Sequence, residues 1–140
     1  MFVPEVRIVN WRDFVGFLRR ADVVVYTEFC LYESCSVEIQ AYVKELGCVF
    51  KHEEPVRSVD VYLMGRKVSR KRLFAKLEEI EAKYRDETGY VSDFKKMHAE
   101  KERYARQWWR RRLRKLVRFL RELGAVEGHF TSAVMVGEVR

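Results

Sequence analysis

Cationic side chains are concentrated in one stretch of the chain, residues 103–121. It contains nine Arg or Lys residues and no Asp or Glu. Clustered cations displace counterions from phosphates, and Arg can also pair with a phosphate through two N–H donors. The stretch therefore predicts contact with a polyanion. The side chains expected to make it are Arg103, Arg106, Arg110, Arg111, Arg114, Lys115 and Arg118.

A second group of cations opens another expected helix. It consists of Arg66, Lys67, Arg70, Lys71 and Arg72. The helix macrodipole disfavours cations at this end, so the group indicates an external anion, with plain surface charge as the alternative. Two aromatic side chains of the first stretch, Tyr104 and Trp108, could stack on unpaired bases. Trp109 is expected to be a core residue instead.

Three cysteines offer thiol chemistry. Cys30 and Cys35 could be structural, form a disulfide or act as a redox pair, and Cys48 is expected to be buried. The three histidines are scattered and no Cys-x-x-Cys pair exists, so no metal site is predicted. Neither a Gly-rich phosphate loop nor a nucleophile elbow occurs, so we expect no catalytic residue and no cofactor.

The formal net charge of +7 over 140 residues is unevenly distributed. Residues 1–88 carry 15 basic and 15 acidic side chains, whereas residues 89–140 carry 13 basic and 6 acidic ones and hold the whole +7. Such asymmetry favours a nucleic acid or a membrane surface as partner. One Asn and two Gln among many charges follow the composition of thermophilic proteins.

The opening residues contain Pro4, Glu5 and Arg7, so no secretory signal is expected. No apolar run approaches the roughly 18 residues that suggest a membrane span. An intracellular, cytoplasmic protein is the expectation.

The cations must be positioned by a long helix, capped by Ser92 and ended by Gly124. Its apolar seam consists of Ala105, Trp109, Leu113, Leu116, Leu120 and Leu123, at steps of three and four. A helix of around thirty residues is about 45 to 50 Å long, so part of it should project or cross a partner.

The rest of the chain predicts a small α+β body over residues 1–88. Residues 89–140, with the long helix and a C-terminal strand, are expected to pack on it. Strands are expected at Glu5–Val9, Val23–Tyr26, Cys48–Phe50, Val56–Leu63 and Ala133–Val136, with a turn at Glu53–Pro55. Helices are expected at Trp11–Arg20 after the cap Asn10, at Val37–Leu46 after Ser34 or Ser36, and at Arg70–Arg85 after Ser69. These elements predict a small mixed sheet with helices on one face.

The run V-V-V-Y-T-E-F-C-L-Y-E-S-C, a helix ending in K-E-L-G, and C-V-F-K-H-E-E together resemble the first βαβ unit of a glutaredoxin or thioredoxin-like domain. The later V-R-S-V-D-V-Y-L-M-G-R-K-V-S and R-L-F-A-K-L-E-E are similar to its closing hairpin and last helix. The resemblance implies a degenerate redox site at Cys30 and Cys35. The family's pair has two residues between its cysteines, and Asp60 stands here at the place of its cis-proline. The same order of elements also fits a ferredoxin-like sheet.

These observations favour a non-enzymatic nucleic-acid-binding protein that contacts the phosphate backbone of DNA or RNA. A second hypothesis makes the long helix a protein–protein arm in a homo-oligomer or larger assembly, paired through Leu113–Leu123. A third is a divergent thioredoxin-like redox protein. A membrane surface is the weakest alternative, because the apolar seam must also pack against the body.

Overall fold

The computed structural model describes residues 3–65, 67–128 and 136–139. They form one mixed sheet of six strands in the order β5-β2-β3-β4-β1-β6. The strands are β1 (Glu5–Ile8), β2 (Val23–Cys30), β3 (Cys35–Val43), β4 (Cys48–Pro55), β5 (Val126–Glu127) and β6 (Val136–Val139). The helices are α1 (Trp11–Arg20), η1 (Lys44–Leu46), α2 (Val56–Val59), η2 (Asp60–Met64), α3 (Lys71–Lys83) and α4 (Phe94–Glu122).

The centre of the sheet is an antiparallel meander of β2, β3 and β4. β1 lies parallel to β4 and to β6, and β5 lies parallel to β2. Along β3 the burial alternates without interruption, as expected when one face of a strand packs on the core. The buried face carries Cys35, Val37, Ile39, Ala41 and Val43, and the other face carries partly exposed polar side chains.

The first helix forms where the sequence predicts it. The Asn10 side chain accepts hydrogen bonds from the backbone N–H groups of Arg12 and Asp13, at 2.9 and 3.2 Å. These two bonds satisfy donors that a helix start leaves unpaired. Trp11 and Phe14 are buried and their rings lie against His52 of β4, so α1 covers the same sheet face as the β3 core residues.

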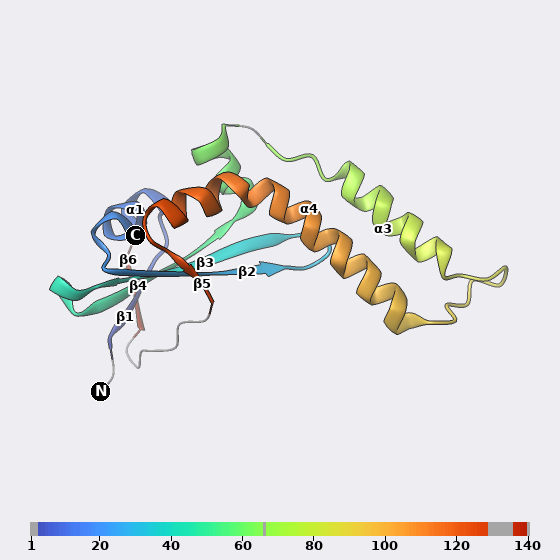
Figure 1. Cartoon of the computed structure of the whole chain (residues 1–140), viewed down its shortest axis with the longest axis horizontal. Coiled ribbons are helices and arrows are strands. Elements are labelled where there is room, and N and C mark those ends of the chain that lie inside the picture. Colours follow the sequence, from blue (N-terminus) through green and yellow to red (C-terminus); the bar gives the residue numbers. More distant parts are fainter. Residues whose placement is uncertain (1–2, 66, 129–135, 140) are drawn as a thin grey trace.

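Helix α4 crosses this face of the sheet and continues well beyond it, and α3 lies alongside its projecting half (Figure 1). The predicted seam is confirmed: Leu113, Leu116 and Leu120 are fully buried. This seam packs within the chain, so an assembly role of α4 would have to use another of its faces. Gly124, with φ of 84°, ends the helix, and Ala125 donates back to the Leu120 carbonyl at 2.9 Å.

The predicted helix at Val37–Leu46 is wrong, because residues 35–43 form β3 and only η1 is helical. Burying Val37, Ile39 and Ala41 together requires alternation between the faces of a strand. The predicted strand Cys48–Phe50 is longer than expected, and the expected turn at Glu53–Pro55 is the end of that strand, β4.

The predicted strand at Val56–Leu63 is also wrong. The segment is helical as α2 and η2, with Val56 and Val59 buried at helical spacing while Val61 and Leu63 are exposed. Two helix starts are shifted: Arg70 precedes α3 where Ser69 was expected, and Asp93 rather than Ser92 caps α4.

The predicted fold class, an α+β chain with a small mixed sheet and helices on one face, is confirmed for the described residues. Most of the expected strand Ala133–Val136 falls outside those residues, and β6 begins at its last position. The division near residue 88 stays a prediction; α3, on one side of that boundary, packs on α4, on the other.

Candidate nucleic-acid interface

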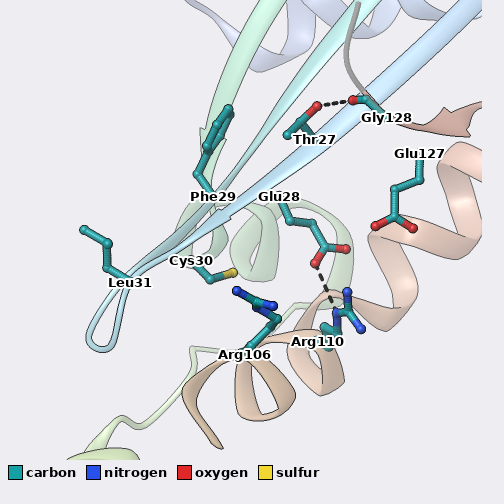
Figure 2. A pocket seen from close by; sticks show the side chains of 9 residues that line it. All are labelled: Thr27, Glu28, Phe29, Cys30, Leu31, Arg106, Arg110, Glu127 and Gly128. Atoms are coloured by element: carbon teal, nitrogen blue, oxygen red, sulfur yellow. Dashed lines mark hydrogen bonds and ion pairs between the residues drawn. The ribbon is translucent and has the colours of Figure 1, made fainter. Parts of the chain in front are cut away.

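A groove runs between β2 and the arginine-bearing side of α4. It consists of two hollows, of about 410 and 700 Å³, that share Glu28, Arg110 and Glu127. We call these two hollows together the basic groove (Figure 2 shows the first). The first is also lined by Thr27, Phe29, Cys30, Leu31, Arg106 and Gly128, and the second by Tyr26, Arg111, Arg114, Val117, Arg118, Arg121 and Glu122.

The wall of the basic groove follows from the periodicity of α4. While the seam residues pack on the sheet, Arg110, Arg114, Arg118 and Arg121 recur at steps of three and four and are exposed along one side. Arg106 extends this row into the first hollow. One helix therefore holds five of the cations at regular spacing on a backbone that the core fixes.

The floor of the basic groove is acidic. Glu28 follows Val24 and Tyr26 at strand spacing on the inward face of β2, and its side chain is only 14% exposed. Its Oε2 lies 3.6 Å from the Arg110 Nε (Figure 2). Glu127 of β5 stands opposite Tyr26 in the parallel register, so both carboxylates belong to the same face of the sheet.

Burial raises the pKa of Glu28 above that of an ordinary glutamate, because desolvation disfavours its charged form. The Arg110 cation lowers this pKa, the neighbouring Glu127 carboxylate raises it, and the more distant Arg121 lowers it. Desolvation is the largest influence, so the ion pair with Arg110 does not fully compensate for removing Glu28 from water.

Among the predicted contact residues, Arg106, Arg110, Arg111, Arg114 and Arg118 line the basic groove. Arg103 and Tyr104 line a different cleft, between α3 and α4, where the Lys76 ammonium lies 5.9 Å from the Tyr104 ring. Lys115 is exposed on α4 but lines neither hollow.

The described members of the second basic cluster line neither hollow of the basic groove. Arg70 donates to the Glu33 carbonyl at 3.0 Å, and Lys71 and Arg72 are exposed at the start of α3. Lys67 borders a shallow depression beside α2. Arg66 lies outside the described residues. A role for this cluster as a second anchor stays a prediction.

The prediction that Trp108 stacks on bases is wrong. The residue is 5% exposed, and its ring packs edge-on against Trp109 and lies under the Arg112 guanidinium, 3.8 Å from the ring centroid. A ring enclosed in this way has no free face for a base. The expected core position of Trp109 is confirmed, with 1% of the residue exposed.

Cys30 and Cys35 are joined by a disulfide between the paired ends of β2 and β3. Of the roles expected for this pair, the disulfide is therefore the one that the structure shows. Cys35 is buried, whereas Cys30 lines the first hollow, and the Arg106 guanidinium points toward its sulfur (Figure 2). The hairpin tip also contacts α4, because the Tyr32 hydroxyl hydrogen-bonds His98. Cys48 is buried and unbridged, as predicted.

The contact residues predicted from the sequence do not include Arg121 or the two carboxylates of the floor, Glu28 and Glu127. A signal for Glu28 was present, because Val24, Tyr26 and Glu28 alternate along one strand and the charged residue continues the inward positions. No local pattern indicates Glu127. Its place depends on the pairing of β5 with β2, a contact between residues about a hundred positions apart.

In the part of the chain that the structure describes, no group of three or more His, Cys, Asp or Glu side chains could hold a metal ion. No helix of that part has both the length and the apolar character needed to cross a bilayer. Comparisons with models of protein families, with curated proteins and with solved structures find no match. The thioredoxin-like resemblance stays a prediction.

Proposed function

We propose that the chain is a nucleic-acid-binding protein whose basic groove holds a phosphate backbone. The observation that carries this proposal is the continuous row of arginines at 106, 110, 114, 118 and 121 along one open groove. Each arginine that meets a phosphate releases condensed counterions, which is the main source of sequence-independent affinity. DNA and RNA both present the charge that this row requires.

The proposal does not depend on a catalytic step. Guanidinium groups recognise phosphate through paired N–H donors, and their backbone is fixed by the buried seam of α4. The two hollows share Glu28, Arg110 and Glu127, so the row of arginines borders adjoining hollows, as binding of a polymer requires. The net charge of residues 89–140 supports the same partner, because a positive field attracts a polyanion before contact.

The test is a titration of labelled single-stranded RNA, single-stranded DNA and duplex DNA across a salt series. It compares the natural chain with a variant in which Arg110, Arg114 and Arg118 are changed to Gln. If all three contact phosphates, the slope of log affinity against log salt should flatten by about 0.7 to 0.9 for each lost contact. Affinity at low salt should also fall.

A matched control changes three cations outside the groove, Arg12, Arg19 and Arg57, to Gln. They are exposed on α1 and α2, and their loss lowers the net charge by the same amount. If the net charge of the whole chain were responsible for binding, the affinity and the salt slope would decrease equally in both variants. The groove would then not be the binding site. Failure of the natural chain to bind any of the probes at low salt would refute the proposed function.

The redox hypothesis has one supporting observation, the disulfide whose Cys30 member borders the groove. Titration of thiols in a graded dithiol buffer tests it. Reversible reduction and reoxidation of the pair near the potential of a cellular thiol pool would support a redox role. A pair that resists such a buffer would be a structural bridge.

A further inference from the structure

The acidic floor of the basic groove does not match a ligand made of phosphates alone. Glu28 and Glu127 line both hollows, between the arginines and the sheet. A phosphate placed near them would be repelled. The pKa of Glu28 is already raised, first by burial and then by the neighbouring Glu127 carboxylate. The groove therefore offers two chemistries, cations on its wall and hydrogen-bond acceptors on its floor.

Glu28 has acceptor capacity that the described part of the chain does not fill. An ionised carboxylate can accept about four hydrogen bonds. The only charged contact within ion-pair distance of Glu28 there is the Arg110 Nε at 3.6 Å, longer than the roughly 3.2 Å of a normal N–H···O bond. Because the side chain is 14% exposed, water can satisfy only part of the remainder. A ligand that brings N–H donors would satisfy the rest.

Glu127 enlarges the same acceptor surface. It stands on the neighbouring strand, on the same face as Glu28, and its register partner Tyr26 precedes Glu28 by two residues. Both carboxylates line the same two hollows, so one planar ring of a ligand could reach both. The acceptors thus form a patch rather than a single point.

A nucleotide of an unpaired strand has both complementary features. Its phosphate suits the arginines, and its base edge can supply N–H donors to the floor. Guanine alone presents two adjacent donors on one edge, N1–H and the N2 amino group, which match the two oxygens of a carboxylate. Adenine and cytosine present one amino group there, and uracil and thymine present one N–H between two acceptors. In a duplex the N1–H of guanine is already paired, so its edge can be read only in a single strand.

We propose that the basic groove binds single-stranded nucleic acid and that Glu28 selects guanine by accepting hydrogen bonds from N1–H and the N2 amino group. This inference rests on the proposed function and specifies the ligand of the same site. Arg110 is 58% exposed and can turn from Glu28 to the phosphate when a base takes its place. Glu127 supports the same edge from β5.

The test uses pyrimidine strands that carry one central guanine, inosine or adenine, measured by fluorescence anisotropy. Inosine keeps N1–H and lacks the N2 amino group. The guanine strand should bind about 5- to 100-fold tighter than the adenine strand, with inosine between them. Glu28→Gln should remove most of this preference while the affinity for the adenine strand stays equal or rises, because a charge that repels phosphate is gone.

Glu87→Gln is the matched control, because it removes an exposed carboxylate in the loop between α3 and α4, away from both hollows of the basic groove. It should leave the base preference intact. Glu127→Gln should weaken the preference without abolishing it. Urea unfolding of each variant shows whether the fold is kept, and an unfolded Glu28→Gln chain would be replaced by Glu28→Ala or Glu28→Asp.

Equal affinity for the three strands would overturn the guanine inference and leave the proposed function standing. A preference that persists in Glu28→Gln would overturn the role of Glu28. A duplex that binds as tightly as the guanine strand would overturn the single-strand requirement. If free guanosine monophosphate competed at concentrations as low as those of the guanine strand, the site would take a mononucleotide. This result would overturn the inference of a polymer ligand. Absence of binding by every strand would refute both proposals.

Discussion

The Arg110 guanidinium lies beside the Glu28 carboxylate where the two hollows meet, with 3.6 Å between Nε and Oε2. The two partners differ in exposure: Arg110 is 58% exposed and Glu28 is 14% exposed. The cation is therefore screened by water while the carboxylate is largely desolvated. This asymmetry makes Glu28 the partner whose protonation responds to changes around the groove.

Protonation of Glu28 should be visible in the stability of the chain. Its pKa is raised in the folded state, mainly by desolvation, so the folded chain holds the proton more tightly than the unfolded chain. The free energy of unfolding should then fall as pH rises from the ordinary glutamate pKa through the raised one. Glu28→Gln should remove this decline and stabilise the chain near neutral pH. Urea unfolding from about pH 4 to pH 7 measures it, and parallel curves for the two proteins would contradict the expectation.

Asp86 should show the opposite sign of pH dependence. Its Oδ1 accepts from the Thr88 hydroxyl, the Thr88 N–H and the Tyr90 N–H, at 2.6, 2.8 and 3.0 Å, and these bonds lower the pKa of Asp86. The stability they contribute is present above the ordinary aspartate pKa and is lost as pH falls through the lowered one. Asp86→Ala should lower the melting temperature at neutral pH, with the difference shrinking in acid. Glu87→Ala, in the same loop, is the control.

The two faces of α4 should respond differently to substitution. Leu116 is fully buried, so Leu116→Ala should cost about 2 to 5 kcal/mol of unfolding free energy, through lost burial and the cavity left behind. Arg114→Gln, two residues away on the exposed side, should change it by less than about 0.5 kcal/mol. Chemical denaturation measures both, and a large loss in the arginine variant would mean that the groove wall is part of the folding core.

Reduction of the disulfide should destabilise the chain moderately. The bond closes a short loop, with a sequence separation of 5, and the loop-entropy relation gives about 2 kcal/mol for a loop of this size. The Leu31 N–H still donates to the Ser34 carbonyl at 2.9 Å, so the hairpin turn should survive. Urea unfolding with and without a dithiol reductant measures the loss. A Cys30→Ser, Cys35→Ser variant should be insensitive to the reductant, and a loss that persisted in this variant would contradict its assignment to the Cys30–Cys35 bond.

Local signals predicted α1, α3 and α4 well, and they gave the wrong element for β3 and for the helical segment of α2 and η2. Asn10 and the apolar spacing after it placed α1, and the seam of α4 was readable at steps of three and four. At Val37–Leu46 a serine before the segment and Gly47 after it favoured a helix, although the alternation of Val37, Ile39 and Ala41 pointed to a strand. Only pairing with both neighbours decides such a case, and pairing is not a local property.

The same limit applies to the candidate site. The arginine row belongs to one helix and could be recognised from sequence alone. The floor combines Glu28 with Glu127, and their juxtaposition exists only because the chain reverses at Gly124 and pairs β5 with β2. The contact of the Arg112 guanidinium with the Trp108 ring could not be predicted from the sequence either, because the exposure of neither side chain follows from its spacing.

Helix α4 carries two kinds of structural constraint along a single run of residues. Leu113, Leu116 and Leu120 are held by the packing of the sheet, whereas Arg110, Arg114 and Arg118 contact little of the core. Changes at Arg114 and Arg118 should therefore carry little folding penalty, while changes at the leucines should carry a large one. A descendant of this chain could acquire a different ligand by drift along one side of the helix and keep its architecture unaltered.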